Sequence, residues 1–518
     1  MIRIRNIKVD IKNDDLKSHI DKLLKVKDYD YTLVKKSIDA RHKDNIKFIY
    51  TVDVNVSMKN VKRKSDDIFE TPKEVYNFNI TGDKKELFRP VIVGAGPSGL
   101  FIAYLLSIND YKPIIIERGE DVESRVDTIE NFWKTNDLNS ESNVQFGEGG
   151  AGTFSDGKLN TLVNDSEFRK KFVLETFVKF GANENILYDA HPHIGTDILR
   201  VVVKNMREYI ISKGGEYRFN TKLTNINVVN NKLDGIEVND DEIILCNNLF
   251  LCIGHSARDT FEMLNNVGLN MKSKPFAVGV RIIHNEKDIS KSMYGPDYNY
   301  LEPASYKLTY NTSEKRGVYS FCMCPGGYVV NASSENGRVA INGMSNQKRD
   351  SGASNSAIVV TVNSNDFGDK LFDGMNFQRE LEEKAYKHGN GLMPAQRYED
   401  FKLNRVTTKL GSINPITKGD ITLSNLNDVL PEFITNPLKE AIPYFEGKIK
   451  GYSNPDSILL AVESRTSSPV KIERNELGIS NIEGIYPTGE GAGYAGGITT
   501  AAIDGMKQAE NYAKIYRP

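Results

Sequence analysis

A glycine-rich turn between an apolar strand and an apolar helix constrains this chain most. Residues 90–100 read PVIVGAGPSGL, in which an apolar run precedes Gly94, Gly96 and Gly99 and a second apolar stretch follows them. This is the strand–turn–helix context of the dinucleotide-binding fingerprint. Gly94 allows the tight turn, Gly96 lets the backbone approach a pyrophosphate, and Gly99 lets the helix pack closely on the strand. The segment therefore predicts a dinucleotide site.

The residues that follow the turn fit the same interpretation. Pro97 and Ser98 open the helix, whose free N–H groups and positive dipole end favour phosphate groups. A second apolar run at 114–116 ends at Glu117 and Arg118, close to the position, roughly 20 residues downstream, where the fingerprint places an acid. A carboxylate there accepts hydrogen bonds from a ribose 2′-hydroxyl. We expect all four residues to contact the dinucleotide.

Composition limits the class of protein. A chain of 518 residues is too long for one simple core and predicts two or three domains. The net charge of −2 and the hydrophobic content of 39% are typical of soluble proteins. The sequence contains no run of about 18 apolar residues that could form a membrane helix, and the N-terminus lacks the apolar core of a signal peptide. We therefore expect a cytoplasmic protein that does not associate with membranes.

Shifts in pattern divide the chain into five segments. Residues 1–57 alternate apolar and polar positions around one helical stretch, which predicts a small α+β module. Residues 58–86 are polar and charged and predict a connector with little core of its own. The nucleotide domain consists of two segments, residues 87–262 and residues 456–518. Between these two parts, short strands and turns at 263–455 predict an inserted domain.

Two further glycine-rich loops accompany the fingerprint, at 147–159 and at 484–498. Such a density of glycine costs conformational entropy, which favours loops that wrap a ligand. In two-part flavoproteins, an acid after a late strand faces the ribitol or pyrophosphate side of FAD, and the next helix points its N-terminus at the flavin ring. The expected cofactor contacts in these loops are Gly149, Gly150, Ala151, Gly152, Thr153, Asp156, Lys158, Gly489, Glu490, Gly496, Gly497 and Ile498.

Together these segments resemble the family of FAD-dependent, or NAD(FAD)-utilising, dehydrogenases. The resemblance runs from residue 37 to the C-terminus, and it implies an FAD-binding oxidoreductase without implying a particular substrate. In many flavoproteins of similar plan the acid of the last loop is Asp, whereas here it is Glu490. The matching stretches are 37–41, 147–159, 193–197, 254–259, 321–327, 342–345, 463–469 and 489–498.

Four side chains are candidates for the reacting centre. Lys158 lies in the loop nearest the expected flavin. His255 follows Gly254 at a strand end where such flavoproteins touch the adenosine half of FAD. We expect Gly254 to contact the cofactor. For His255, either a local hydrogen bond or a cofactor contact is consistent with the sequence. Arg281 follows an apolar strand and could project into a substrate cleft. Arg465 could bind an anionic substrate or brace the flavin loops, and a structural ion pair is equally consistent with both arginines.

The cysteines do not indicate dithiol chemistry. Cys322 and Cys324 are spaced too closely for the usual redox pair to close without strain. We expect both to be buried structural thiols, with a place in the active-site wall and a redox or metal role as the alternatives. No ligand spacing typical of zinc is found, and neither a second nucleotide fingerprint in its strand–turn–helix context nor a CxxC pair is found.

The predicted fold class is α/β: a Rossmann-like FAD-binding domain with an inserted mixed-sheet substrate domain and a small N-terminal α+β module. The predicted function is an FAD-dependent oxidoreductase that transfers a hydride between flavin N5 and a small-molecule substrate. We expect FAD to bind non-covalently, because no His or Cys is convincingly placed for a covalent link. NAD(P)H is expected only as a transient donor, so electrons would come from the substrate or from an electron-transfer partner protein.

Two other functions stay open at this stage. The N-terminal module carries a mild excess of Lys and Arg, which would suit an FAD-dependent RNA-modifying enzyme. The near-neutral net charge and the lack of a long basic stripe make nucleic acid an unfavoured partner. The other alternative is a non-catalytic flavin protein that only carries electrons.

Overall fold

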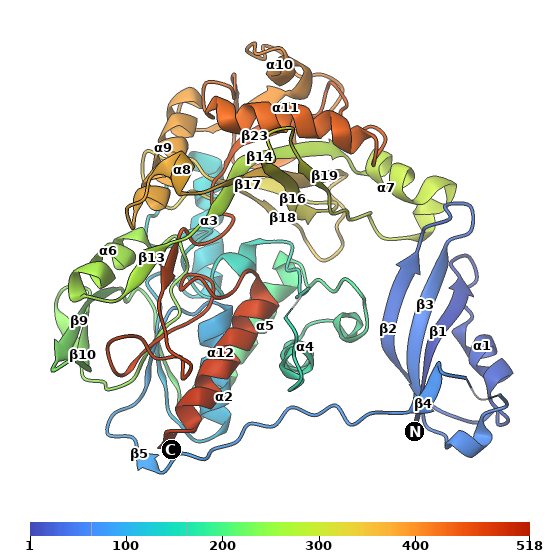
Figure 1. Cartoon of the computed structure of the whole chain (residues 1–518), viewed down its shortest axis with the longest axis horizontal. Coiled ribbons are helices and arrows are strands. Elements are labelled where there is room, and N and C mark those ends of the chain that lie inside the picture. Colours follow the sequence, from blue (N-terminus) through green and yellow to red (C-terminus); the bar gives the residue numbers. More distant parts are fainter. Residues whose placement is uncertain (64, 162) are drawn as a thin grey trace.

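The computed structural model describes residues 1–63, 65–161 and 163–518. Three larger sheets organise the chain (Figure 1). The N-terminal sheet is antiparallel and is covered by one helix. In its third strand Phe48, Tyr50 and Val52 are buried while the residues between them are half-buried, which confirms the alternation predicted for a strand with one buried face. The module consists of β1 (Ile2–Asp10), α1 (Leu16–Leu23), β2 (Tyr31–Asp39), β3 (Lys47–Val54) and β4 (Ile68–Glu70), in the sheet order β2-β3-β1-β4.

This sheet extends into the segment that the sequence predicts as a connector. Ile68 of β4 pairs with Ile4 of β1, and both Ile68 and Val61 are buried in the module's core. The prediction that 58–86 has little core of its own is therefore wrong for its first part. A strand of three residues has too few positions to show a period, so its pairing with β1 could not be found by pattern.

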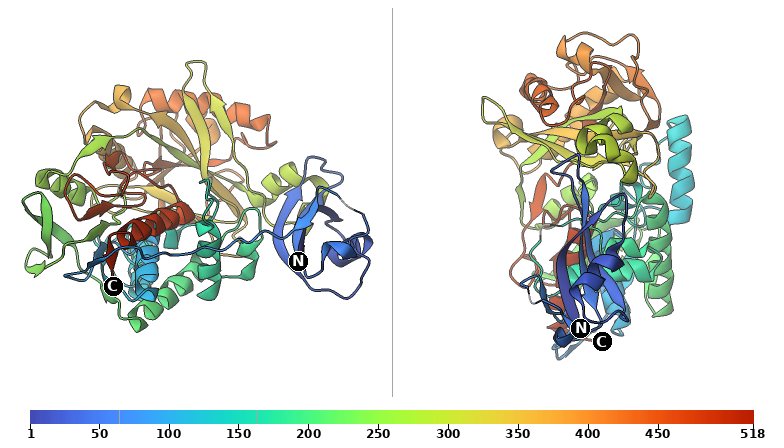
Figure 2. Two further views of the ribbon diagram at one scale, coloured as in Figure 1. Left: turned by 60° about the horizontal axis from the view of Figure 1, so that its bottom comes forward. Right: turned by 90° about the vertical axis from the view of Figure 1, so that its right-hand side faces the viewer.

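The module contacts the rest of the molecule through the edge of β2. The Lys36 N–H donates a hydrogen bond to the Tyr188 carbonyl oxygen at 2.6 Å, and the Ala190 N–H donates one to the Lys36 carbonyl oxygen at 2.8 Å. An extended segment then runs from β4 back to β5 (Lys84–Lys85), which pairs with the C-terminal β26 (Tyr516–Arg517) (Figure 2).

The central sheet is wholly parallel and has five strands. Its order is β25-β12-β6-β7-β8, so the strand next to β12 comes from the C-terminal part of the chain. This arrangement confirms the predicted Rossmann-like fold class. The strands are β6 (Val91–Val93), β7 (Ile114–Ile116), β8 (Glu216–Arg218), β12 (Leu249–Leu251) and β25 (Ile485–Pro487).

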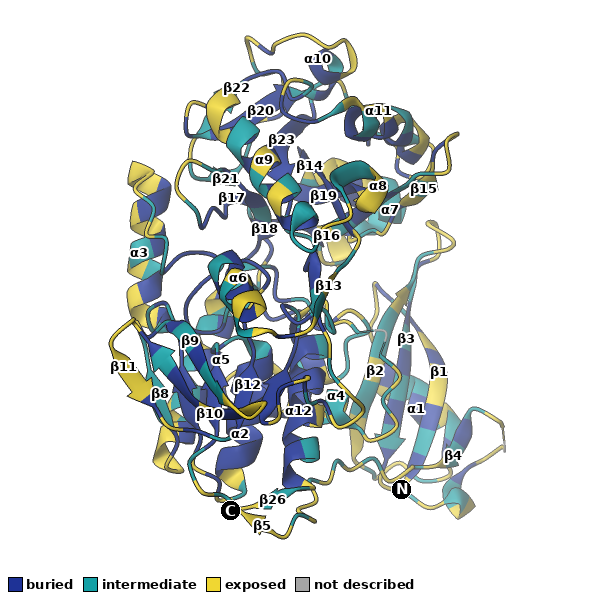
Figure 3. Cartoon of the chain, turned by 60° about the vertical axis from the view of Figure 1, so that its left-hand side comes forward, coloured by how far each residue is buried: buried dark blue, intermediate teal, exposed yellow. Residues whose placement is uncertain are grey.

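Because side chains alternate along a strand, each strand of this sheet supplies two cores. Ile92 and Phe250 face the helical layer, whereas Val91 and Leu251 face the opposite layer. Figure 3 shows the deep burial of α2 and β12. The helical layer contains α2 (Pro97–Ile108), α4 (Arg169–Lys179), α5 (Thr196–Ser212) and α12 (Ile498–Ala513), and the opposite layer contains β9 (Leu223–Val229), β10 (Lys232–Val238), β11 (Glu242–Ile244) and α6 (Arg258–Val267).

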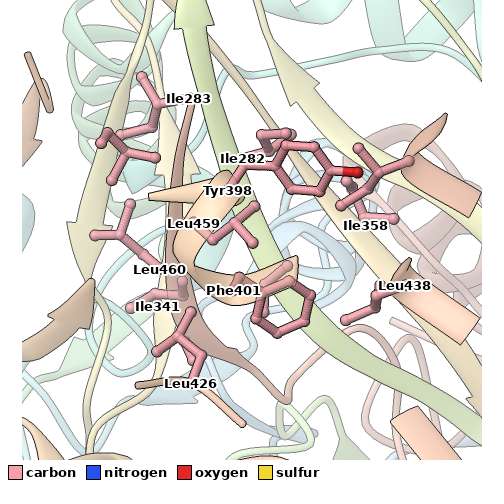
Figure 4. Close-up of a cluster of buried hydrophobic side chains, with 14 of the residues drawn as sticks. Ile282, Ile283, Ile341, Ile358, Tyr398, Phe401, Leu426, Leu438, Leu459 and Leu460 are labelled. Atoms are coloured by element: carbon pink, nitrogen blue, oxygen red, sulfur yellow. The ribbon is translucent and has the colours of Figure 1, made fainter. Parts of the chain in front are cut away.

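A seven-stranded mixed sheet forms the largest core, shown in part in Figure 4. Its order is β15-β16-β19-β14-β23-β20-β22. Buried leucines of α11 and β23, such as Leu438 and Leu459, pack with Ile282 and Ile358 of the central strands. The elements are β14 (Phe276–Asn285), α7 (Glu286–Tyr294), β15 (Thr309–Asn311), β16 (Gly317–Cys324), β19 (Ala353–Val362), α9 (Asp373–His388), β20 (Met393–Arg397), β22 (Ile421–Leu423), α11 (Glu432–Glu446) and β23 (Ile458–Glu463).

None of the helices in the described chain is long and apolar enough to span a bilayer. Further elements complete the described chain. They are η1 (Met58–Asn60), α3 (Val122–Thr135), η2 (Ala151–Phe154), η3 (Glu184–Leu187), β13 (Met271–Ser273), η4 (Gly295–Tyr300), β17 (Tyr328–Asn331), β18 (Ile341–Met344), α8 (Ser364–Phe367), α10 (Tyr398–Lys402), β21 (Thr417–Lys418) and β24 (Val470–Ile472).

Candidate functional site

The three glycine-rich segments meet at the N-termini of α2 and α12. The Gly149 N–H donates a hydrogen bond into the fingerprint turn at 2.9 Å. A methyl group on Gly150 would lie 3.2 Å from Gly96 Cα, and one on Gly152 would lie 3.0 Å from the Ile498 side chain. Segments far apart in the chain therefore form one site, to which two helix N-termini bring positive dipole ends.

Glu117, at the end of β7, ties two of these segments together. Its Oε2 accepts a hydrogen bond from the Ala95 N–H at 2.9 Å. Its Oε1 accepts from the Gly119 N–H at 3.0 Å and from the Gly147 N–H at 2.9 Å. Sequence reasoning assigned this buried carboxylate to a ribose only. The structure adds a second role, because the carboxylate also satisfies three backbone donors around the turn.

Arg118 is already neutralised by protein groups. It forms ion pairs with Glu141 and Asp259 at 2.6 and 3.0 Å, and its guanidinium lies 4.1 Å from the centroid of the Phe146 ring. A dinucleotide contact from Arg118 would have to compete with these partners.

Several predicted contact residues hold the loops in place. Ser98 is buried, and a methyl group on Gly489 would lie 2.6 Å from its Oγ. Thr153 is also buried, and its carbonyl oxygen accepts a hydrogen bond from the hydroxyl of Thr196, the first residue of α5. Pro97 and Ala151 are half-buried. Ser98 and Thr153 therefore pack the site from behind, and Pro97 and Ala151 keep exposed atoms.

The carboxyl ends of β12 and β25 place His255 against Glu490. His255 Nδ1 lies 2.6 Å from Glu490 Oε1, and the His255 backbone N–H donates to Oε2 at 3.3 Å. Burial alone would raise the pKa of Glu490, but the adjacent His255 outweighs it and holds that pKa below its ordinary value. His255 Nε2 is buried and has no hydrogen-bond partner among the described residues. A ligand group at this nitrogen would satisfy it.

Lys158 belongs to a cluster centred on Asp156. Arg349 donates to this carboxylate from Nε at 3.0 Å and Nη2 at 2.6 Å, the Ser345 hydroxyl donates to Oδ1, and Lys158 Nζ lies 2.6 Å from Oδ2. Burial alone would raise the pKa of Asp156, yet the Lys158 and Arg349 charges hold it well below its usual range. Sequence reasoning missed Arg349, which no motif marks and which is 193 residues from Asp156.

A β-bulge in β16 brings the inserted domain to Lys158. The register with β19 shifts between Phe321 and Cys324, and Cys322 adopts a left-handed backbone with φ of 41°. The Met323 carbonyl oxygen accepts a hydrogen bond from Lys158 Nζ. Bulges of this kind re-aim groups next to active sites.

The expectation of two buried thiols is right for Cys324 and wrong for Cys322, which is exposed. Cys324 Sγ donates a hydrogen bond to the Cys322 carbonyl oxygen at 3.3 Å. The bulge turns the Cys322 side chain out of the core, which residue spacing alone could not indicate.

Arg281 forms a buried ion pair and does not project into a cleft, so the structure favours the structural alternative for Arg281. Its side chain is 0% exposed and pairs with Glu463 through Nε at 2.8 Å and Nη2 at 3.0 Å. It also donates to Asn355 Oδ1, Asn342 Oδ1 and the Cys322 carbonyl oxygen. A charged side chain on a buried strand must be fully paired. Arg281 therefore holds the bulge in β16 in place from the buried side of the strand.

Arg465 forms an ion pair instead of facing open space. Its Nε and Nη2 donate to the two oxygens of Glu382 on α9, both at 3.0 Å, and its Nη1 donates to Ser256 and Ser334. Arg258 of α6 pairs with the same Glu382. This network links the two large domains, so the structure favours the structural alternative for Arg465.

Comparisons with known proteins agree with this geometry. Residues 275–466 match the family model described as "FAD-dependent protein, C-terminal domain-like", and residues 92–152 match the NAD(P)-binding Rossmann-like domain. Residues 1–55 match a domain of unknown function. A protein of Clostridium beijerinckii, described only as uncharacterized, is 47% identical over 526 residues, which cover 98% of each chain. The chain belongs to this family of FAD-dependent proteins.

Solved structures similar to this FAD-dependent protein are distant. Glycine oxidase from Bacillus cereus is 11% identical, with a TM-score of 0.35, over 83% of this chain and 98% of that one. Quinol fumarate reductase from E. coli is also 11% identical, with a TM-score of 0.36, over 82% of this chain and 69% of that one. Similarity at this level says nothing about the substrate.

The glycines of the site test whether it fits FAD. At Gly254, Gly496 and Gly497 an added methyl group would meet nothing within 4 Å, and all three residues are exposed. At Gly94 and Gly99 the same group would press into backbone atoms. Open space therefore adjoins the end of β12 and the start of α12, at the sheet edge where α/β folds bind ligands. With the unpartnered imidazole nitrogen and the two helix N-termini, these residues fit FAD.

Proposed function

We propose that this protein is an oxidoreductase that binds FAD non-covalently and acts on a small-molecule substrate. The observation that carries the proposal is the meeting of three glycine-rich segments at two helix N-termini, beside glycines that face open space. A turn that is both glycine-rich and empty on one side suits a ligand that must approach the backbone.

We assign each part of the site to one part of the FAD molecule. Glu117 would hold the adenosine ribose, and Gly96 at the N-terminus of α2 would face the pyrophosphate. Glu490, oriented by His255, would face the ribitol side. The flavin ring would lie between Lys158 and the start of α12, whose dipole favours negative charge at that end of the ring.

When bound, FAD supplies two-electron redox chemistry, and the protein supplies binding, orientation and electrostatics. The inserted domain would contribute the substrate side through the bulge at Cys322–Cys324, because its Met323 carbonyl oxygen already contacts Lys158. Arg281 and Glu463 keep that bulge in place from beneath. The substrate or an electron-transfer protein would supply the electrons, with NAD(P)H as a transient donor only.

Substitution of Gly254 tests the cofactor proposal. Its backbone is not left-handed, and a side chain there meets no protein atom within 4 Å, so Gly254→Val is expected to fold normally and to lose FAD. Gly254→Ala is expected to show an intermediate affinity. Flavin released on denaturation is identified by chromatography, and the melting temperature of each apoprotein is compared with that of the wild type. Release of FMN, or no flavin even after reconstitution of the wild type, would contradict the proposal.

A further inference from the structure

The cluster around Asp156 carries more positive charge than its carboxylate can neutralise. Lys158 and Arg349 both pair with this single carboxylate. The neighbouring His193 adds no charge at neutral pH, because burial lowers its pKa. Two cationic side chains therefore share one hydrogen-bonded carboxylate, and an uncompensated charge is costly where it is buried.

An ion pair with Asp156 alone does not account for Lys158. Arg349 already donates two N–H groups to that carboxylate, and Ser345 donates its hydroxyl. Asp156 is thus satisfied without the lysine. The side chains of Asp156 and Arg349 are 3% and 8% exposed, whereas that of Lys158 is 32% exposed. Of the two cations, Lys158 is the one that the cluster presents to a ligand.

The ammonium group of Lys158 has one N–H donor without an acceptor among the described residues. It donates one N–H to Asp156 Oδ2 and one to the Met323 carbonyl oxygen, and the described residues offer no third acceptor. Since an ammonium group carries three donors, the third N–H points to a group outside the protein. The backbone of Lys158 and its neighbour is held still, because Thr499 in the first turn of α12 donates its hydroxyl to the Leu159 carbonyl oxygen at 2.9 Å.

These contacts also fix where the ammonium group lies. The Met323 contact places it beside the bulge of the inserted domain, and the Leu159 contact holds the adjoining backbone against the first turn of α12. It therefore stands at the junction of the two domains, next to the exposed Cys322. The positive helix dipole and the left-over charge of the cluster act in the same direction.

We propose that Lys158 binds an acidic group of the substrate, and that the substrate is a small carboxylate. The inference rests on the proposed flavin site, and it adds the chemical class of the molecule that enters it. A single remaining N–H suits one carboxylate oxygen, because lysine acts as a compact point charge and not as a two-pronged donor.

Paired ligands that differ in charge but not in shape test this inference. Acetate, benzoate and succinate are titrated against acetamide, benzamide and succinamide, with the FAD-loaded full-length protein. Binding is followed by the change in the visible flavin spectrum and by calorimetry. In the wild type, at least one carboxylate is expected to bind ten or more times more tightly than its amide. In Lys158→Met this preference is expected to disappear while the amides bind as before, and Lys158→Arg is expected to retain most of it.

Lys384→Met is the matched control, because it removes a lysine from the exposed side of α9; it is expected to leave every titration unchanged. Equal binding of acid and amide in all three pairs would overturn the inference, as would an unchanged preference in Lys158→Met. Phosphate that binds more tightly than every carboxylate would overturn the proposed class. A lower flavin potential in Lys158→Met with unaltered carboxylate binding would assign the charge to the cofactor instead.

Failure of the flavin proposal gives a different result. If the protein neither contains nor takes up FAD, the visible spectrum is absent, but calorimetry on the same variants still reports whether Lys158 distinguishes acid from amide.

Discussion

At the scale of single residues, glycines of one motif have different functions. Gly96 has an ordinary backbone, with φ of −74°, and a methyl group on it would lie in normal contact, 3.9 Å from Gly150 Cα. A methyl group on Gly99 would overlap the Gly94 carbonyl oxygen. The packing of α2 on β6 therefore requires Gly99, whereas the proposed pyrophosphate contact would account for Gly96.

Gly96→Ala is therefore expected to fold with nearly unchanged stability and to bind FAD at least about tenfold more weakly, a loss of about 1.4 kcal/mol. Gly99→Ala is expected to lose about 1–3 kcal/mol of unfolding free energy, because overpacking displaces the helix. FAD titration and denaturant unfolding of both apoproteins measure the two effects. A destabilised Gly96→Ala with normal FAD affinity would show that the fingerprint has been assigned wrongly.

Glu117→Ala is expected to affect the apoprotein as well as the complex. Without the carboxylate, three backbone N–H groups near Ala95, Gly119 and Gly147 lose their acceptor, and an unsatisfied buried donor costs about 1–3 kcal/mol. We expect a loss of about 3 kcal/mol in unfolding free energy of the apoprotein, in addition to weaker FAD binding. Glu117→Gln, which keeps one acceptor oxygen, is expected to lose less. Full apoprotein stability in Glu117→Ala would restrict this residue to the ribose.

At the scale of elements, helix α9 links the two large domains. Glu382 on α9 is buried and accepts hydrogen bonds from Arg258 of α6 and from Arg465 in the segment after β23. Burial alone would raise the pKa of Glu382, but these two arginines hold it well below its usual range. A carboxyl group with a lowered pKa stabilises the folded state above its unfolded pKa of about 4.3, and this contribution is lost as the pH falls.

Glu382→Gln is expected to lower the unfolding free energy by about 3 kcal/mol at pH 7, because it leaves buried arginine charge without its main partner. The difference from the wild type is expected to shrink progressively below about pH 4, because the Glu382 carboxyl group of the unfolded chain then takes up a proton while that of the folded protein stays charged. Glu383→Gln is the matched control on the same helix, since its side chain is 43% exposed and forms an ion pair with Arg338. Denaturant melts from pH 3 to 8 measure both variants; a pH-independent difference would contradict the assigned charge.

Elements with a clear period could be predicted from the sequence, and pairings between distant segments could not. The alternation predicted within residues 1–57 is observed in β3 (Lys47–Val54), and the apolar run at 114–116 is observed as β7 (Ile114–Ile116). The glycine segments of the site were found because their spacing carries a known physical demand. Arg349 was missed and the role of Arg281 stayed open, because an isolated arginine carries no signal of the carboxylate that the fold will bring to it.

At the scale of the whole molecule, one parallel sheet is available for binding a dinucleotide. The described residues contain one five-stranded parallel sheet, and its fingerprint is assigned to FAD. We therefore expect NADH and NADPH to reduce the bound flavin slowly and with weak saturation. Anaerobic stopped-flow at the flavin absorbance band measures this directly. Rapid bleaching that saturates at micromolar NAD(P)H would require a nicotinamide site that the fold does not suggest.

The position of β25 has a consequence for how the protein is made. This strand pairs with the edge of β12, yet the whole seven-stranded domain lies between them in the chain. Synthesis runs from the N-terminus, so a nascent chain exposes the unpaired edge of β12 until Ile485–Pro487 leave the ribosome, with Glu490 and α12 behind them. The proposed cofactor site is thus completed only after the whole inserted domain has been made, and a message truncated within that domain yields a product without β25, Glu490 and α12.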